Sequence, residues 1–276
     1  MTTRYAAHPA DVKHYDTARL RQEFLADNLV VPGRQEWVYS HYDRFVFGAI
    51  VPTDLVISLG NFPQLKADYF LERRELGVLN LGGAGSIIVD GTTYIMDPYD
   101  CLYVGRGAQT VSFASDDAAK PALFYANSTP AHKTYPTTRN SQADANVVHL
   151  GSNETANDRT LYQYIHEGGI PSCQLVMGFT ELAPGNVWNT FPPHTHARRM
   201  EVYFYFDFPE DQVVLHLMGQ PDETRHLFLA NNQAVISPDW SIHSGAGTVA
   251  YKFVWGMGGE NQSFNDMDGV ALRDVR

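Results

Sequence analysis

The sequence is poor in cysteine, and it lacks both long apolar runs and an excess of positive charge. Its two cysteines, Cys101 and Cys173, are too few for a disulfide framework and wrongly spaced for a zinc knuckle. No run approaches the roughly 18 apolar residues of a membrane span, and the first residues have no secretory apolar segment. A net charge of −11 argues against binding to nucleic acid or to an anionic membrane. We therefore expect a cytoplasmic protein with buried free thiols.

The abundant residue types favour strands and turns. The chain contains 15 Phe, 15 Tyr, 22 Gly and 15 Pro, and short β-rich runs alternate with turn signals at a spacing of about ten residues. Asp90 and Gly91 stand between two such runs, the preferred pair for a type I′ hairpin turn. One short helix is predicted over residues 16–25, capped by Asp16. The predicted fold class is all-β, in sandwich or barrel domains.

The chain also predicts two domains related by a weak internal repeat. Residues 128–157 are polar and rich in Thr, Pro and Asn, which is typical of a linker. We therefore expect an N-terminal barrel over 1–135, preceded by a short helical arm, and a C-terminal barrel over 136–276. Aligning Glu75 with Glu201 superposes the two strand patterns, but the first half has no histidines at the matching positions. Any metal site is thus expected in the second half.

One motif in the second half has the composition of a metal site. His194 and His196 share one face of an extended strand, Glu201 follows, and His243 ends a later apolar run. Three imidazoles and a carboxylate complete the ligand set of a borderline divalent cation such as zinc. The odd offset from His196 to Glu201 would place them on opposite faces of a regular strand, so a bend or bulge is predicted near Arg198.

This spacing resembles the two-part metal motif of the cupin superfamily. The chain departs from that motif at Phe208 and at Trp240, where glycine is usual, and both departures affect turns and leave the ligands unchanged. The resemblance implies an all-β bicupin, with two double-stranded β-helix (jelly-roll) barrels and a few short helices. Metal ligands are retained in the second barrel alone.

A closer resemblance, to the 5-keto-4-deoxyuronate isomerase family of pectin breakdown, covers essentially the whole chain. It implies one zinc ion per chain, bound by His194, His196, Glu201 and His243, and a hexameric assembly. It also implies conversion of 5-dehydro-4-deoxy-D-glucuronate, a small anionic sugar, to 3-deoxy-D-glycero-2,5-hexodiulosonate. The segments that carry the resemblance are residues 69–78, 180–190, 194–206, 218–226, 234–245 and 255–262.

Residues for substrate binding and proton transfer are less well defined by the sequence. Guanidinium groups pair with carboxylates through two parallel hydrogen bonds, so arginines near the motif are candidates to bind the substrate: Arg198, Arg199 and Arg225. An aldose–ketose isomerase needs a Lewis acid beside a carbonyl and a general base that moves a proton between adjacent carbons. The motif does not identify that base, and the candidates are Glu181, Tyr203 and Glu223. His216 and His226 have no motif partner and are expected to be structural.

Three other functions use the same features. A cupin dioxygenase would hold Fe(II), Mn(II) or Ni(II) with the same ligands and consume oxygen. An isomerase of a related deoxyglucuronate in inositol breakdown would differ in substrate alone. A sugar-binding bicupin without catalysis is the third, but burying four metal ligands without a metal is costly, which argues against it.

Overall fold

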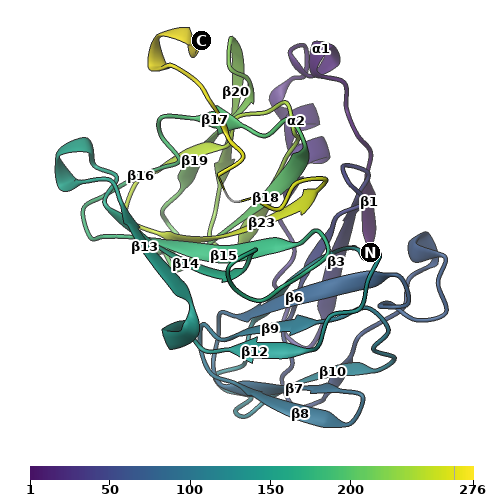
Figure 1. The fold of residues 1–276 in the computed structure, drawn as a ribbon. Helices are drawn as coiled ribbons and strands as arrows, with labels where there is room; N and C mark the ends of the chain where they lie inside the picture. Colours follow the sequence, from purple (N-terminus) through teal and green to yellow (C-terminus); the bar gives the residue numbers. More distant parts are fainter. Residues whose placement is uncertain (264) are drawn as a thin grey trace. The chain divides into compact units, whose positions relative to one another are not determined.

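The computed structural model describes residues 1–263 and 265–276 and is built almost entirely of short β-strands (Figure 1). The predicted all-β class is confirmed. Helices α1 (Pro9–Val12) and α2 (Thr17–Phe24) lie near the N-terminus. Asp16 caps α2, because its Oδ1 accepts a hydrogen bond of 2.8 Å from the backbone N of Arg19, so the helix predicted over 16–25 is confirmed.

The chain divides into two compact units, each assembled from separate segments. The first consists of Met1–Thr3, Asn28–Ala145 and Tyr164–Val176, and the second of Arg4–Asp27, Asn146–Gln163 and Met177–Arg276. The contiguous division expected at residue 135 therefore differs from the structure. Residues 4–27 belong to the second unit because β2 (Leu25–Ala26) pairs with β21 (Gln233–Ser237) and Arg21 Nη1 donates to Phe228 O.

The first unit contains a sheet of seven strands and a sheet of four. Asp90 and Gly91 connect β7 (Gly85–Val89) to β8 (Thr92–Met96) with φ of 46° and 85°, the positive angles that a type I′ turn requires, so the predicted hairpin is confirmed. The larger sheet has the order β1 (Thr2–Arg4), β3 (Gln35–Ser40), β4 (Val46–Ile50), β11 (Phe124–Pro130), β6 (Arg74–Asn80), β9 (Cys101–Val104) and β12 (Thr138–Asn140); the smaller has β5 (Ile57–Ser58), β10 (Val111–Ser115), β7 (Gly85–Val89) and β8 (Thr92–Met96).

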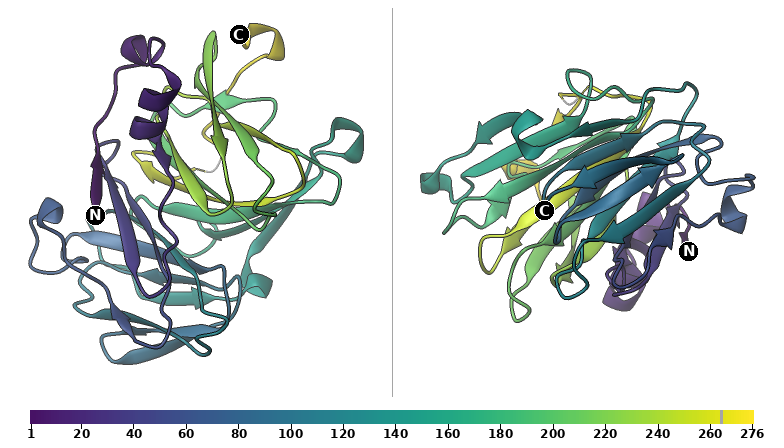
Figure 2. Two further views of the ribbon diagram at one scale, coloured as in Figure 1. Left: turned by 180° about the vertical axis from the view of Figure 1, so that it is seen from behind. Right: turned by 90° about the horizontal axis from the view of Figure 1, so that it is seen from below.

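The second unit repeats this arrangement, in agreement with the internal repeat read from the sequence. Its seven-stranded sheet has the order β13 (Asn146–Leu150), β14 (Arg159–Ile165), β15 (Val176–Leu182), β23 (Lys252–Gly259), β18 (Arg199–Phe206), β21 and β2. Its four-stranded sheet has the order β16 (Trp188–Asn189), β22 (Ser244–Gly247), β19 (Val214–Gln220) and β20 (Glu223–Leu229). Figure 2 shows these strands from two further directions. A fifth sheet consists of two short strands, β17 (His194–Thr195) and β24 (Asp268–Gly269).

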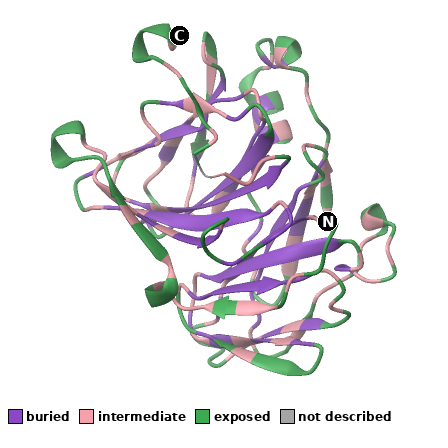
Figure 3. Cartoon of the chain, in the orientation of Figure 1, coloured by how far each residue is buried: buried purple, intermediate pink, exposed green. Residues whose placement is uncertain are grey.

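Apolar side chains from both sheets of a unit form its core. In the first unit, Leu76 and Val78 of β6 belong to one buried cluster with Ile87 of β7 and Phe113 of β10. The two sheets therefore pack face to face, as in a cupin barrel. Figure 3 shows the central strands β6, β18 and β23 buried along their length, whereas β8 and β13 carry exposed residues.

The polar segment predicted as a linker over residues 128–157 is largely structured, so that prediction is wrong. It contains the end of β11, the strands β12 and β13, and the short 3-10 helices η2 (Gln142–Asp144) and η3 (Asn153–Thr155). β12 and β13 are edge strands that pair on one side each. An edge strand exposes much of its surface, as Val147 at 45% does, so a polar composition there is compatible with a sheet.

Glu75, which aligns with Glu201, is a fully buried carboxylate that needs no cation. Its two oxygens accept hydrogen bonds of 2.7–2.9 Å from Tyr103 Oη, Thr129 Oγ1 and the backbone N atoms of Cys173, Gln174 and Leu175. Donors on every side satisfy the charge. In the first unit this position therefore anchors the segment around Cys173.

We expect Glu75→Gln to lower the free energy of unfolding by about 3–5 kcal/mol. The amide cannot accept all these hydrogen bonds, and its NH2 group would face the donors that now bind the carboxylate. Urea denaturation of the purified protein measures the loss. Glu72→Gln, a partly exposed carboxylate in the same charged run, is the matched control and should cost less than about 1 kcal/mol. Equal losses in the two variants would contradict the anchoring role.

Candidate metal centre

The four predicted ligands belong to the second unit: His194 and Glu201 lie on strands, whereas His196 and His243 lie just outside strand ends. β17 ends at Thr195 and β18 begins at Arg199, so the regular alternation of side chains is interrupted between His196 and Glu201. The predicted bend is therefore present. His243 lies between β21 and β22, immediately before Ser244.

The four candidate ligand atoms converge within 4.8 Å of one another. His194 Nε2 lies 3.1 Å from His196 Nε2 and 3.0 Å from His243 Nε2. Glu201 Oε2 lies 3.3 Å from His196 Nε2 and 3.1 Å from His243 Nε2. A tetrahedral shell with ligands at about 2.0–2.1 Å from its centre has edges of roughly 3.3–3.4 Å. The residues therefore fit a four-coordinate cation.

The hydrogen bonds of the Nδ1 atoms show on which ring nitrogen His196 and His243 carry their proton. His196 Nδ1 lies 2.7 Å from Asp266 O and His243 Nδ1 lies 3.3 Å from Ser241 O, so both Nδ1 atoms carry the hydrogen. Their Nε2 lone pairs then face each other and the Glu201 carboxylate. Acceptors at about 3 Å repel one another unless a cation lies between them.

Burial keeps the imidazoles of His194 and His243 neutral, the state in which they bind metals. The pKa of His194 is lowered to about 3, mainly by desolvation and then by the charges of His196 and Arg199. Desolvation also lowers the pKa of His243 well below its usual value, with smaller effects from the neighbouring histidines. The cluster is therefore ready to bind a cation at neutral pH.

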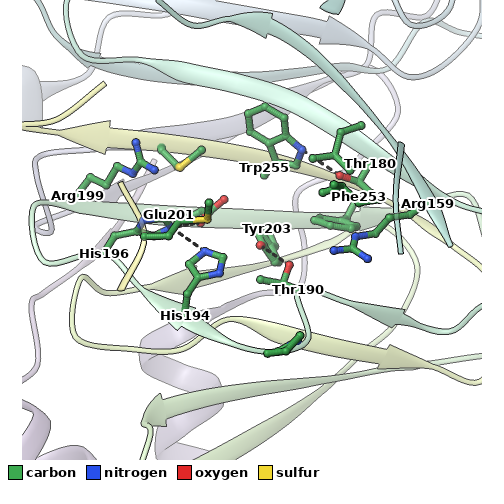
Figure 4. A pocket seen from close by; sticks show the side chains of 15 residues that line it. Arg159, Thr180, Thr190, His194, His196, Arg199, Glu201, Tyr203, Phe253 and Trp255 are labelled. Carbon is green, nitrogen blue, oxygen red and sulfur yellow. Dashed lines mark hydrogen bonds and ion pairs between the residues drawn. The ribbon is translucent and has the colours of Figure 1, made fainter. Parts of the chain in front are cut away.

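A cavity of about 210 Å³ opens beside the cluster (Figure 4). Ligand pockets for drug-sized molecules run from roughly 300 to 1,000 Å³, so this cavity suits a smaller ligand. Of the predicted catalytic and substrate-binding residues, Tyr203 and Arg199 line it. The full lining is Leu150, Arg159, Leu161, Thr180, Thr190, Pro192, His194, His196, Arg199, Glu201, Tyr203, Phe253, Trp255, Met257 and Met267.

Arg199 is almost fully buried, and its guanidinium binds the polypeptide backbone of the C-terminal segment. Nη1 donates to Ser263 O at 2.6 Å and to Asn261 O at 3.4 Å, and Nη2 donates to Asp266 O at 3.4 Å. Asp266 O also receives the hydrogen bond of His196 Nδ1. Arg199 therefore lines the cavity, as a candidate for substrate binding would, and its guanidinium positions the candidate ligand His196 through this segment.

The other predicted candidates lie outside the cavity lining. Arg198 lies in the turn just before β18, where its side chain is 60% exposed and pairs with Glu260 at 2.9 Å. Arg225 pairs with Glu223 at 2.9 Å and also donates to Lys13 O. Glu181 pairs with Lys252 at 3.3 Å. The structure engages each of these charges elsewhere, which corrects their assignment to the site.

Sequence reasoning missed three polar residues of the cavity, Arg159, Thr180 and Thr190. Thr190 Oγ1 lies 3.0 Å from Tyr203 Oη and accepts a hydrogen bond of 3.0 Å from Asn189 Nδ2. Burial, followed by the charge of Glu201, raises the pKa of Tyr203 well above its usual value, so the phenol keeps its proton. Tyr203 is thus a hydrogen-bond donor and a poor general base. Thr190, between Asn189 and Phe191, gave no chemical signal, and Arg159 lies far from the motif in sequence.

His216, predicted to be structural, lies fully buried in the same unit. Its Nδ1 is 2.8 Å from Tyr205 Oη. His226 is exposed on β20 and outside the cavity lining. The buried position of His216 agrees with a structural role, whereas the structural role expected for His226 stays a prediction.

Comparisons with known proteins place this architecture in a family. The model of the KduI/IolB family matches residues 27–272. The chain belongs to the KduI/IolB family. The resemblance to uronate isomerases is thereby confirmed at the level of the family.

Curated relatives share more than half of their residues with the chain. It is 56% identical over 274 residues to the 4-deoxy-L-threo-5-hexosulose-uronate ketol-isomerase of Formosa agariphila, covering 99% of this chain and 98% of the relative. It is 55% identical over 278 residues to the protein of that name from Escherichia coli, covering all of both chains. These names confirm the predicted enzyme class, a ketol-isomerase, which is an intramolecular oxidoreductase.

Solved structures support the fold of this KduI/IolB-family chain. An IolB-like protein from Salmonella typhimurium matches 90% of it and 96% of its own chain, with a TM-score of 0.75 and 14% identity. Vicilin from Corylus avellana matches 82% of this chain and 78% of its own chain, with a TM-score of 0.56 and 9% identity. In the described part of the chain, no helix has both the length and the apolar character needed to cross a membrane.

The buried His216 predicts a loss of stability in acid. Burial lowers its pKa to about 3, below its value of roughly 6.5 in the unfolded chain. The unfolded state therefore binds the proton first, and stability falls as the pH drops below about 6.5. Between pH 7 and pH 5 we expect the wild-type protein to lose about 2 kcal/mol more than His216→Asn. Urea denaturation at both pH values measures this, and parallel losses would contradict it.

Proposed function

We propose that the chain is a zinc-dependent aldose–ketose isomerase that converts 5-dehydro-4-deoxy-D-glucuronate to 3-deoxy-D-glycero-2,5-hexodiulosonate. The observation that carries this proposal is the convergence of His194, His196, Glu201 and His243 beside a small cavity. Curated relatives at 52–56% identity that are named ketol-isomerases of a hexosulose-uronate support the substrate.

Zinc suits the ligand set better than other common divalent ions. Three imidazole nitrogens and one carboxylate oxygen at tetrahedral spacing favour zinc, whereas magnesium and calcium prefer shells of oxygen. A bound zinc ion would supply a Lewis acid for the substrate carbonyl. The chain's own residues then have to orient the substrate, exclude water and donate hydrogen bonds.

The hydroxyl pair of Thr190 and Tyr203 can supply one such donor. The two hydroxyls, 3.0 Å apart, share one hydrogen bond, and Thr190 Oγ1 already accepts from Asn189 Nδ2. Neither hydroxyl has another hydrogen-bond acceptor among the described residues, so one O–H is available to the cavity. A donor fixed there stabilises negative charge that develops on a substrate oxygen.

The walls of the cavity limit the access of water. Phe253, Trp255 and Met257 of β23 line it, and Trp255 Nε1 is already engaged with Thr180 Oγ1 at 3.1 Å. Apolar walls strengthen the electrostatic interactions of the polar groups that remain. They also protect an electron-rich intermediate from protonation by solvent.

We further propose that the enzyme acts in the cytoplasm and as a homo-oligomer, specifically a hexamer. Cys101 and Cys173 are both buried free thiols, which suits a reducing compartment. The hexamer rests on the family resemblance of the sequence.

The decisive assay incubates the zinc-loaded protein with the 4-deoxy-5-keto-uronate released by pectin lyases and follows the ketose product. The deoxyglucuronate of inositol breakdown serves as the competing substrate, and an oxygen electrode tests for dioxygenase activity. We expect turnover of the pectin-derived uronate without oxygen uptake. Oxygen consumption, or preference for the inositol-derived substrate, would replace the proposed reaction with one of the alternatives.

Removing a ligand should abolish both metal binding and turnover. For His194→Ala and His243→Ala we expect zinc content to fall well below one ion per chain and kcat to fall at least about 10³-fold, because three ligands cannot hold the cation in place. Elemental analysis and the isomerase assay measure the two effects. His226→Ala, an exposed histidine on β20, is the control and should retain both. Full zinc content and full activity in a ligand variant would refute the site.

Loss of the Tyr203 hydroxyl should slow turnover without loss of metal. For Tyr203→Phe we expect kcat to fall about 10²-fold with a small change in KM, since a donor to developing charge acts mainly in the transition state. Tyr162→Phe, a tyrosine stacked on Phe179, is the control. Unchanged kcat in Tyr203→Phe would show that another group supplies the donor.

A further inference from the structure

We propose that Arg159 binds the carboxylate of the substrate and so determines which end of the molecule meets the metal-ligand cluster. This proposal rests on the proposed function, since it takes the substrate to be a short-chain uronate. No sequence motif or relative's name assigns a role to Arg159, and the structure assigns it through position and charge.

Arg159 reaches the cavity from β14, the strand next to the edge strand β13 of the larger sheet. It is the first residue of β14, lies opposite Leu150 of β13, and lines the cavity that contains the cluster. In Figure 4, Tyr203 and Thr190 lie between Arg159 and the metal-ligand side chains His194 and Glu201. The cavity therefore has a cationic end, a hydroxyl pair in the middle and a metal-ligand end.

The guanidinium of Arg159 is half buried and has no carboxylate partner within ion-pair distance among the described residues. Its Nη1 donates to Asn157 O at 2.8 Å, which is a neutral partner. Apolar side chains, Leu161 and Phe253, line the cavity with it. Desolvation lowers the pKa of Arg159, yet a guanidinium stays charged at neutral pH. A partly desolvated cation without an anion is costly, so an anionic ligand would stabilise this arrangement.

The other arginines near the site are already engaged. Arg199 is held by backbone carbonyls of the C-terminal segment, and Arg198 pairs with Glu260 outside the cavity. With a net charge of −11 the protein as a whole repels an anion, so a local cation has to attract the substrate. Arg159 is the arginine of the cavity with donors left to pair bidentately with a carboxylate.

This position predicts the orientation of the substrate. The uronate carries its carboxylate at one end of a six-carbon chain and its aldehyde at the other. With the carboxylate on Arg159, the aldehyde and its neighbouring hydroxyl lie at the metal-ligand end, beside the Thr190–Tyr203 pair. The same geometry selects against sugars that lack the terminal carboxylate.

The test compares Arg159→Gln with Arg198→Gln in the zinc-loaded protein. We expect Arg159→Gln to raise KM for the uronate about 10- to 100-fold while kcat changes less than about 10-fold, because a charge-assisted bidentate contact to a remote group acts mainly in binding. Zinc content and melting temperature should be unchanged. Arg198→Gln should match the wild-type protein. Arg159→Lys keeps the charge but cannot form two parallel hydrogen bonds, so it should give an intermediate KM. This variant also provides the test if the glutamine variant does not fold.

A binding measurement separates a carboxylate contact from a structural role. D-gluconate and its neutral amide, D-gluconamide, differ in charge at one end of a six-carbon chain. By calorimetry the wild-type protein should bind gluconate at least about 10-fold more tightly than gluconamide, and Arg159→Gln should bind the two equally. An unchanged KM together with an unchanged preference for gluconate in Arg159→Gln would overturn the proposal. If the preference depends on Arg159 but the uronate is not turned over, the carboxylate site stands and the proposed reaction fails.

Discussion

Four acceptor atoms that face one another at about 3 Å are the constraint on which the second unit depends. Imidazole lone pairs and a carboxylate repel each other, and burial removes the water that would otherwise separate them. The surrounding chain holds them there. Arg199 donates hydrogen bonds to the backbone of the C-terminal segment, and that segment orients the ring of His196 through Asp266 O. The pairing of β17 with β24 holds His194 in the same way.

The two units solve one problem in different ways. Each places a buried glutamate on the matching strand of a seven-stranded sheet, Glu75 on β6 and Glu201 on β18. The carboxylate of Glu75 accepts hydrogen bonds from donors of its own unit, whereas the carboxylate of Glu201 faces imidazole nitrogens such as His196 Nε2. The first arrangement contributes a rigid anchor, and the second can bind a cation. Among the described residues, the difference between the two units thus lies in what surrounds a single carboxylate.

The candidate metal ligands could be predicted because His194, His196 and Glu201 lie close together in the sequence, and the bend between His196 and Glu201 followed from counting residues along one strand. The cavity could not be predicted in the same way. Arg159 enters it from a strand whose place in the sheet depends on long-range pairing. Arg198 and Arg199 are adjacent in sequence, and composition cannot tell which of them a strand turns inward. The domain boundary was misplaced because edge strands are polar, and polarity alone resembles a linker.

The pairing of Leu25 with Val235 has a consequence for folding and for handling of the protein. β21 would be an edge of the larger sheet of the second unit if β2 did not cover it. During synthesis β2 emerges long before its partner, so its pairing groups stay without β21 until most of the second unit has been made. A variant shortened at the N-terminus would leave that edge permanently unpaired, and open edges are where β-proteins aggregate.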